Sequence, residues 1–288
     1  MLAGPHPQAL SLLPSPFSLS LGGELPTPAG VNVSMLQADR LTKYYSGIAA
    51  IRDVSFSVQP GQVLGYLGPN GSGKSTTVKL LTGLLEPTAG SVRYNGVSIH
   101  DQLIEYRSAL GYVPEEAHVY SYLTGPEFLA LIGRLRGIPE RLLQRRIKDL
   151  LEIWGLTDAR YTTLASYSKG MRQKVLLSAA LLHNPKVLIL DEPDAGLDVT
   201  ALLVLRAVVA RLAAQGRIVM YSSHVLPTVE SICSDVVILH EGQVVAHDTI
   251  GRLRDLMSLP SLEQVFRKLA VHTDVEGTAD RLLGAISQ

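Results

Sequence analysis

The chain has 288 residues, 46% of them apolar, so it can bury a sizeable core and is neither a disordered nor a fibrous protein. Its 26 Lys and Arg side chains balance 26 Asp and Glu side chains, which excludes an overall field that draws it to nucleic acid or anionic lipid. We therefore expect no nucleic-acid partner, and any polyanion must be held locally.

Cysteine usage and hydropathy favour a reducing, aqueous compartment. The single cysteine, Cys233, cannot form an intrachain disulfide and is expected to be a buried thiol. No stretch has the roughly 18 uncharged apolar residues of a membrane-spanning helix. The best candidate, residues 201–214, contains Arg206 and Arg211. If the protein works at a membrane, it does so through a partner.

The first 34 residues contain six prolines and neither lysine nor arginine, so we expect a disordered N-terminal extension over 1–34 rather than a secretory signal. From Leu36 the pattern predicts a short strand, a turn at Ser46-Gly47 and a second strand over 54–58, which together make an antiparallel opening. A strand over 62–67 then runs into a glycine-rich loop.

A helix over 74–85 follows this loop, and 91–99 is expected to form another edge strand around a turn at Asn95-Gly96. Over about 116–167 the pattern changes to helices, with a capping box made by Thr124 and Glu127 before the first of them. This segment is our candidate for a helical subdomain.

Strand patterns return over 187–190, 218–221 and 236–239, with helical runs between them. This order predicts an α/β fold with a parallel sheet. A helix over 261–269 is the last that the pattern predicts, and 271–288 is a C-terminal tail with no assigned structure.

The glycine-rich loop fits the phosphate-loop pattern, in which two glycines separated by four residues are followed by Lys and Ser. Its glycines let backbone N–H groups converge on phosphates, and the helix that begins near Lys74 adds its positive end. We expect Lys74 to reach the β- and γ-phosphates and Ser75 to ligate Mg²⁺. The alternative is an ordinary glycine-rich turn. The expected ATP-binding residues of this segment are Gly68, Pro69, Asn70, Gly71, Ser72, Gly73, Lys74, Ser75 and Thr76.

Two carboxylates, Asp191 and Glu192, end the apolar run over 187–190. A buried parallel strand delivers such residues to the sheet edge where a phosphate loop also lies. We expect Asp191 to hold Mg²⁺ through its water shell and Glu192 to orient and deprotonate the attacking water. Taken alone, two acids after a strand are more often a helix cap, so this assignment depends on the phosphate loop.

Ser168 and Gly170 lie directly before a helical run, where a hydroxyl, unpaired amides and the helix dipole can bind phosphate. An ordinary N-cap would also explain Ser168. With the two preceding motifs, residues 167–171 resemble the Leu-Ser-Gly-Gly-Gln signature of the ATP-binding cassette family, and the resemblance covers about 36–270. In that family the signature caps the γ-phosphate of ATP bound to the opposite subunit. The resemblance therefore implies a dimer that encloses two nucleotides.

Further residues match landmarks of this family in the expected order. Tyr45 matches the aromatic residue that stacks on adenine, with Tyr44 as a second candidate, although an exposed strand aromatic is the alternative. Asp198 matches the loop that joins the two sites across the dimer and is otherwise a helix cap. His224 matches the switch histidine that reaches the γ-phosphate. The catalytic residues implied by the resemblance are Lys74, Glu192 and His224.

Three positions depart from the family pattern. Glu115 stands where a glutamine is usual; it can still ligate Mg²⁺ but adds negative charge near the γ-phosphate. Lys169 and Met171 replace the first glycine and the glutamine of the signature. In these variants the sequence resembles the cassettes that pair with separately encoded ABC-2-type exporter permeases. The implied metal ligands are Ser75, Glu115 and Asp191.

The resemblance implies an ATPase domain over 35–270 with a phosphate-loop NTPase core, an antiparallel β subdomain and an inserted helical subdomain. It implies ATP and Mg²⁺ as ligands and a second copy or a homologous ATPase as the other half of the dimer. It also implies an integral membrane permease, bound through a groove beside Glu115 and the helical subdomain. The chain would be cytoplasmic, peripheral on the inner face of the cell membrane, and would drive export.

Two other functions stay open. A soluble cassette that acts on ribosomes or nucleic acid typically has tandem cassettes with a charged linker or a long coiled-coil insertion, and this sequence shows neither. A regulatory module that holds ATP without hydrolysing it is disfavoured by the presence of Lys74, Asp191, Glu192 and His224. Glu115 and the altered signature leave room for it.

Overall fold

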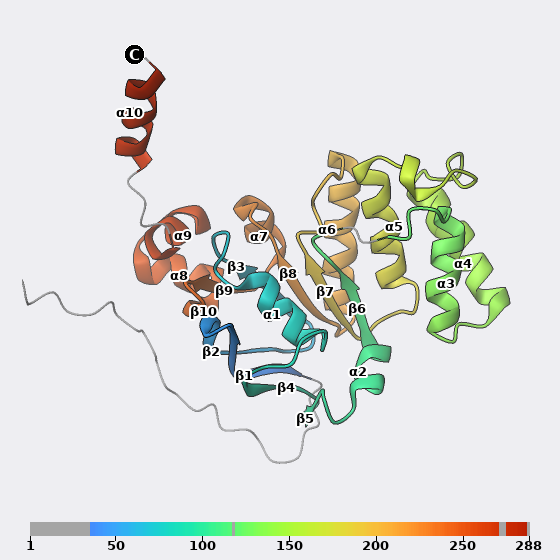
Figure 1. Cartoon of the computed structure of the whole chain (residues 1–288), viewed down its shortest axis with the longest axis horizontal. Coiled ribbons are helices and arrows are strands. Elements are labelled where there is room, and N and C mark those ends of the chain that lie inside the picture. Colours follow the sequence, from blue (N-terminus) through green and yellow to red (C-terminus); the bar gives the residue numbers. More distant parts are fainter. Residues whose placement is uncertain (1–34, 117–118, 271–274, 287–288) are drawn as a thin grey trace, which may run out of the picture.

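Figure 1 shows the computed structural model of the chain, which describes residues 35–116, 119–270 and 275–286. The expected extension over 1–34 lies outside the described residues, as do parts of the expected tail, 271–274 and 287–288. In the described part, a mostly parallel sheet forms the centre, an antiparallel sheet covers one of its faces, and helices surround both. The predicted α/β fold is confirmed.

The central sheet has six strands in the described residues, in the order β10-β9-β3-β8-β7-β6. All neighbours pair in parallel except β10 with β9. Every residue of β3, β7 and β8 is buried, because helices or the second sheet cover both faces. The strands are β3 Val63–Leu67, β6 Leu110–Val113, β7 Val187–Asp191, β8 Ile218–Ser222, β9 Asp235–His240 and β10 Gln243–Thr249.

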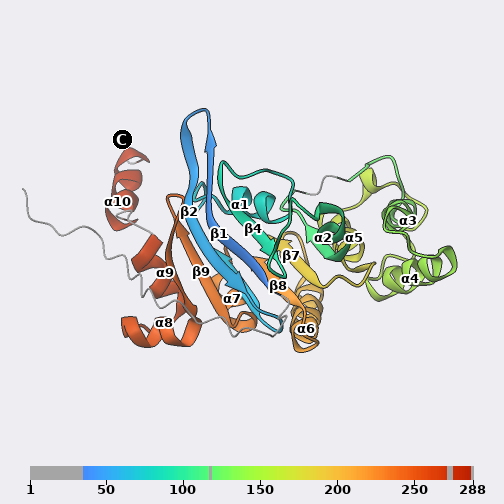
Figure 2. The same cartoon turned by 90° about the horizontal axis from the view of Figure 1, so that it is seen from below.

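The antiparallel sheet has the order β2-β1-β4-β5 and packs its apolar face on the central sheet. Its second strand begins at Ile48, six residues before the expected start at residue 54, since register shifts between β1 and β2 break the apolar alternation there. Figure 2 shows the long β1–β2 hairpin beside the central strands. The strands are β1 Leu36–Tyr45, β2 Ile48–Val58, β4 Ala89–Tyr94 and β5 Val97–Ser98.

Ten α-helices lie in the described residues. The helix expected over 74–85 ends at Leu81, because Gly83 takes the left-handed backbone (φ 67°) that terminates a helix. The helix expected to be the last, α9, is followed by α10, which two glycines had hidden from the pattern. The helices are α1 Lys74–Leu81, α2 Leu103–Ala109, α3 Gly125–Leu135, α4 Glu140–Ile153, α5 Lys169–Leu181, α6 Val199–Ala214, α7 Leu226–Ile232, α8 Ile250–Met257, α9 Leu262–Ala270 and α10 Val275–Ile286.

The helical segment expected over about 116–167 contains α3, α4 and a short 3₁₀ turn at Leu164–Ser166. Both halves of the capping box form: Thr124 N–H donates to Oε2 of Glu127 at 2.8 Å, and Glu127 N–H donates to Oγ1 of Thr124 at 3.3 Å. Leu164 N–H donates to the Leu123 carbonyl at 2.8 Å, so the two ends of the segment are held together. The segment lies at one end of the molecule (Figure 2).

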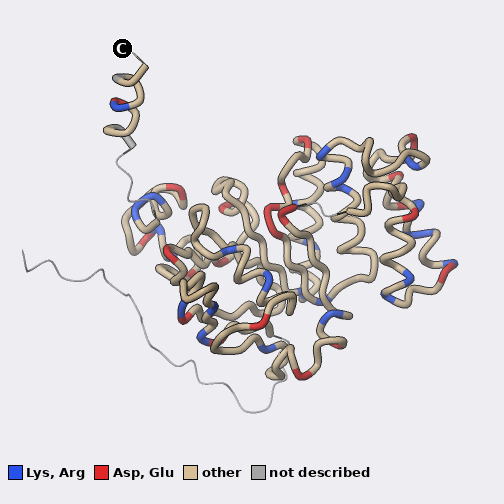
Figure 3. The backbone as a smooth tube through the Cα atoms, viewed as in Figure 1, with Lys and Arg blue, Asp and Glu red and all other residues tan. Residues whose placement is uncertain are grey.

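Positions of Lys and Arg and positions of Asp and Glu are interspersed along the described backbone (Figure 3). Cys233 is buried, as predicted. Among the described residues, every helix is too short or too polar to cross a membrane.

The packing of α3 predicts a contrast between two of its leucines. Leu129 is fully buried, so Leu129→Ala is expected to cost about 2–5 kcal/mol of stability, from lost apolar burial and the cavity left behind. Leu135, in the same helix, is 75% exposed, and Leu135→Ala is expected to change stability by about 0.5 kcal/mol or less. Urea denaturation followed by circular dichroism measures both. Equal effects would contradict this account of the helical core.

Candidate functional site

The loop between β3 and α1 depends on close backbone approaches that only glycine permits. A Cβ on Gly68 would lie 2.3 Å from Oγ of Ser72. Gly73 has φ 103°, and a Cβ there would lie 2.4 Å from Cγ2 of Ile51 and 2.6 Å from the Ala50 carbonyl oxygen. The loop therefore folds tightly onto the start of α1, where backbone N–H groups and the helix dipole favour an anion.

Two polar groups in this loop fit an anionic ligand. Nζ of Lys74 donates to the carbonyl oxygens of Gly68 at 2.7 Å and Pro69 at 3.2 Å, so the ammonium group lies over the loop. Oγ of Ser72 is buried and has no hydrogen-bond partner in the part of the chain that the structure describes. Such a group costs about 1–3 kcal/mol while it stays unpaired. The chemistry of the loop is thus that of a phosphate cradle.

A pocket of about 320 Å³ brings this loop together with the carboxylates at the carboxyl edge of the central sheet. Oγ of Ser75 donates to Oε2 of Glu115 at 3.2 Å, so a side chain two residues after β6 reaches the start of α1. The pocket is lined by Ala50, Asn70, Gly71, Gly73, Lys74, Ser75, Thr76, Glu115, Asp191 and Glu192. Ser75, Glu115 and Asp191, which we expected to ligate Mg²⁺, therefore share one pocket.

Electrostatics in this pocket favour a bound cation. Burial raises the pKa of the Asp191 carboxyl above its usual value, and the charges of Glu115 and Glu192 add to the rise, while the hydrogen bond from Ser222 and the charge of Lys74 oppose it. A divalent cation would offset the repulsion among the three acids. Within the described residues no group of three or more His, Cys, Asp or Glu side chains could hold a metal alone. A hydroxyl, a carboxylate, water and phosphate oxygens are the usual ligands of Mg²⁺, so the residues fit this ion.

Glu192 and His224 contact each other at the rim of the pocket. Glu192 has left-handed backbone (φ 48°), and its N–H donates to the Ser222 carbonyl at 3.1 Å. Nδ1 of His224 lies 2.7 Å from Oε2 of Glu192. The Glu192 side chain is 12% exposed and lines the pocket, whereas the His224 side chain is 75% exposed and does not. His224 is thus connected to the pocket through its contact with the Glu192 carboxylate.

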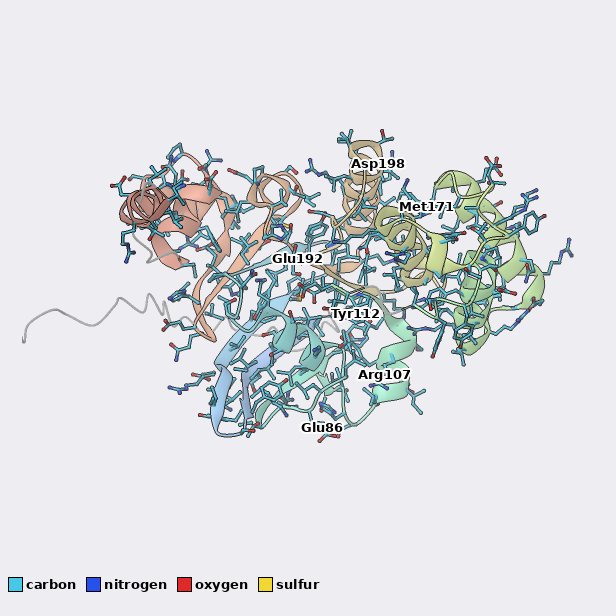
Figure 4. The ribbon with its side chains drawn as sticks, turned by 45° about the horizontal axis from the view of Figure 1, so that its top comes forward. Glu86, Arg107, Tyr112, Met171, Glu192 and Asp198 are labelled. Carbon is cyan, nitrogen blue, oxygen red and sulfur yellow. The ribbon has the colours of Figure 1, made fainter. Side chains whose placement is uncertain are left out.

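The segment that resembles a signature lies outside this pocket. Ser168 is exposed and caps α5, accepting the Met171 N–H at 3.2 Å. A Cβ on Gly170 would lie 2.3 Å from the Gly196 carbonyl oxygen, so the start of α5 packs directly on the loop after β7. In Figure 4, Met171 lies well away from Glu192, on the side of Asp198.

Asp198 is a helix cap in this structure. Its Oδ1 accepts the Ala201 N–H at 2.8 Å, and its Oδ2 accepts from Nζ of Lys174 on α5 at 3.0 Å. These two interactions, the backbone hydrogen bond first, lower the pKa of the Asp198 carboxyl. Asp198 therefore has the helix-cap role that the sequence offered as the alternative, and its contact with Lys174 also ties α6 to α5.

Tyr45 ends β1 and lies outside the pocket as well. Its side chain is 46% exposed, and Nζ of Lys43 lies 5.7 Å from its ring centroid. Tyr44 is 39% exposed. Both aromatic candidates can therefore meet a ligand from the solvent side.

The geometry of a phosphate loop facing strand-end carboxylates agrees with the comparison to known proteins. The model of the ABC transporter family matches residues 51–195 of this 288-residue chain. The chain belongs to the ABC transporter family. Its fold and its ATP-binding segment are thus those of an ABC ATP-binding subunit. Proteins of this type are ATPases that dimerise and work with membrane permeases.

Individual relatives of this ABC protein cover most of the chain. The uncharacterized ABC transporter ATP-binding protein YxlF of Bacillus subtilis (strain 168) is 40% identical over 210 residues, 73% of this chain and 69% of that protein. The linearmycin resistance ATP-binding protein LnrL of the same organism is 34% identical over 224 residues, 78% and 71% of the two chains. A solved ATP-binding subunit of an ABC transporter, 35% identical, superposes with a TM-score of 0.77 over 82% of this chain and 99% of that one.

One polar residue of the ABC site escaped the sequence analysis. Asp194, between Glu192 and the segment over 195–198, accepts hydrogen bonds from the hydroxyls of Tyr221 and Ser223. Its place two residues after Glu192 could have indicated a role in the site, but nothing local in the sequence indicates its hydrogen-bond partners.

The phosphate loop of this ABC protein predicts a large effect of one methyl group. Gly73→Ala is expected to weaken Mg-ATP binding about tenfold or more, because the Cβ would clash with Ala50 and Ile51 in a backbone that is strained for alanine. Gly216 has φ 79° and open space around its Cα, so Gly216→Ala carries the same strain outside the site and should leave binding unchanged. Titration with a fluorescent ATP analogue measures both. Equal affinities of the two variants would contradict the phosphate-cradle geometry.

Proposed function

We propose that this ABC protein hydrolyses ATP with Glu192 as the base and, through a partner permease, couples the hydrolysis to export. The observation that carries the proposal is the single pocket in which the phosphate loop faces Asp191 and Glu192. The ATPase domain of the proposal covers 35–270, with residues about 116–167 as its helical subdomain.

Binding precedes chemistry. The N–H groups at the start of α1 and the Lys74 ammonium group hold the phosphates of ATP, and Tyr45 stacks on the adenine. Ser75, Glu115 and Asp191 would hold Mg²⁺, which would neutralise charge on the phosphate oxygens. To bind ATP, Lys74 exchanges its bonds to the Gly68 and Pro69 carbonyl oxygens for phosphate oxygens.

Hydrolysis uses the carboxylate at the rim of the pocket. Glu192 accepts a proton from the attacking water, whose oxygen then bonds to the γ-phosphorus as the bond to the β-phosphate oxygen breaks. The products are ADP and inorganic phosphate. His224 lies 2.7 Å from Glu192, fixes the orientation of that carboxylate and can turn toward the γ-phosphate.

Two chains are needed for a complete site. Ser168 and Gly170 form a phosphate-binding helix start that faces solvent rather than the pocket of the same chain. A second copy or a homologous ATPase would supply these residues across the dimer, with Asp198 next to the junction. ATP between the chains closes the dimer, and its hydrolysis lets the chains separate.

The groove that we propose for the permease lies between α2 and the helices α3 and α4; it borders the helical segment as expected, but Glu115 lines the phosphate-loop pocket instead of this groove. The groove has a volume of about 830 Å³ and combines exposed apolar side chains, Ile104 and Leu135, with the guanidinium groups of Arg107, Arg136 and Arg146. Figure 4 places Arg107 and Tyr112, which also lines it, on the same side of the molecule. Such a surface fits an amphipathic segment that carries a carboxylate. We propose that a cytoplasmic segment of the permease binds here, which holds the chain at the inner face of the membrane.

The direction of transport is supported by one relative. LnrL is named a linearmycin resistance ATP-binding protein, and removing a toxic compound is one way to confer resistance. We therefore propose export for this chain.

The catalytic part of the proposal predicts the behaviour of Glu192→Gln. The amide cannot take a proton from water, so turnover is expected to fall about 10²–10⁴-fold while Mg-ATP still binds. The variant should accumulate as an ATP-bound dimer, visible by light scattering. Glu241→Gln is the control, since the Glu241 side chain is 87% exposed on the β9–β10 turn. Equal turnover by wild type and Glu192→Gln would refute Glu192 as the base.

The groove predicts a loss of membrane association. In cells of the source organism, the tagged chain is expected to sediment with the membranes, and Ile104→Glu to shift it to the supernatant by placing a charge in the apolar part of the groove. Ile153→Glu is the matched control, because Ile153 is 68% exposed on α4 but does not line the groove. Loss of sedimentation with both variants, or with neither, would contradict this docking site.

A further inference from the structure

Asp194 connects the loops that follow two neighbouring strands. The chain leaves β7 at Asp191 and β8 at Ser222, and the side chain of Asp194 spans the gap between the two loops. Its Oδ2 accepts from the Ser223 hydroxyl at 3.1 Å, and its Oδ1 accepts from the Tyr221 hydroxyl. From these contacts we infer that Asp194 is a positioning residue for the proposed hydrolysis, which acts by holding the turn that presents His224 to Glu192.

The contact with Ser223 reaches both sides of His224. Oγ of Ser223 donates to Asp194 and at the same time accepts the N–H of Val225 at 3.1 Å. The Ser223 hydroxyl therefore holds the peptide that follows His224 and is itself tied to Asp194, while the His224 N–H donates to Oε2 of Glu192 at 3.4 Å. With its backbone held in this way, the exposed His224 ring keeps its Nδ1 at 2.7 Å from Glu192.

The second contact anchors the carboxylate in the core. Tyr221 is fully buried at the end of β8, and Ser223 is 1% exposed, so neither hydroxyl has water as a substitute partner. An ionised carboxylate is a stronger acceptor than a neutral group. The charge of Asp194 also contributes to a raised pKa of Tyr221, after burial as the main cause, which keeps the phenol protonated and donating.

The backbone of Asp194 also starts the segment that leads to Asp198. The carbonyl oxygen of Asp194 accepts the Leu197 N–H at 3.1 Å, and Ala195 N–H donates to the Glu192 carbonyl at 3.3 Å. One residue therefore stands between Glu192, the His224 turn and the segment that the proposed dimer places at its junction. A change in that segment can reach His224 through Asp194, a short covalent and hydrogen-bonded route.

The test is a double-mutant cycle on ATP turnover. Asp194→Ala is expected to lower kcat about tenfold, equivalent to about 1.4 kcal/mol of transition-state stabilisation. The KM for ATP should stay within about twofold, since Asp194 does not line the pocket. In a His224→Ala background, Asp194→Ala should cause no further loss, because its effect runs through the histidine. Asp194→Asn keeps one acceptor oxygen and should recover part of kcat. An equal fold-loss in both backgrounds would overturn the inference and leave the proposed ATPase function intact.

A structural control separates this role from simple destabilisation. Tyr106 is buried and does not line the pocket, and its hydroxyl donates to the Leu81 carbonyl at 2.7 Å. Tyr106→Phe loses one buried hydrogen bond, so its melting temperature should fall while kcat stays at the wild-type value. A kcat loss in Tyr106→Phe comparable to that in Asp194→Ala would overturn the inference.

A second readout does not depend on turnover. The NMR signal of the His224 ring, assigned by its absence in His224→Ala, should shift in Asp194→Ala and Ser223→Ala and stay in place in Tyr106→Phe. An unmoved signal in Asp194→Ala would overturn the inference. Absence of ATP turnover in the wild-type chain would instead refute the proposed function, and the ring signal would then decide the role of Asp194.

Discussion

The parallel pairing of β7 with β8, with Asp191 opposite Ser222, is the constraint on which the site depends. This register lets the Ser222 hydroxyl donate to the Asp191 carboxylate and the Ser222 backbone accept the Glu192 N–H. A slip of one residue would turn Asp191 to the opposite face of the sheet and shift Glu192, which follows it, away from Ser222. Because every residue of both strands is buried, the packing on the two faces makes that slip costly, and the carboxylates are therefore rigidly placed.

Contacts of the loop after β7 connect these strand ends to helix α5. Nε2 of Gln173 on α5 donates to the Pro193 carbonyl at 3.1 Å, and Gly170 fits against Gly196. The start of α5 is thereby set relative to the loop after β7, although it faces away from the pocket. The pocket and the exposed start of α5 therefore belong to one packed unit, so a movement of α5 would also shift the loop after β7.

Local chemistry made part of this site predictable from the sequence. The phosphate loop, the acids at Asp191 and Glu192 and the capping box at Thr124 each depend on residues close together in the chain. Asp194 was missed since its partners lie 27 and 29 residues further along the chain, and the strand pairing alone brings them together. The start of β2 was missed for a related reason, because its register shifts are set by the partner strand. Local sequence patterns therefore do not predict features that depend on pairing between residues distant in the chain.

The position of Lys74 has a thermodynamic consequence for nucleotide capture. Its ammonium group is already satisfied by two carbonyl oxygens of its own loop, so the loop is preorganised around a positive charge before any nucleotide arrives. In the proposed binding mode, nucleotide capture would exchange these two carbonyl oxygens for phosphate oxygens and order little additional backbone. The loop would then lose its conformational entropy when the chain folds, and nucleotide binding would not have to order it again.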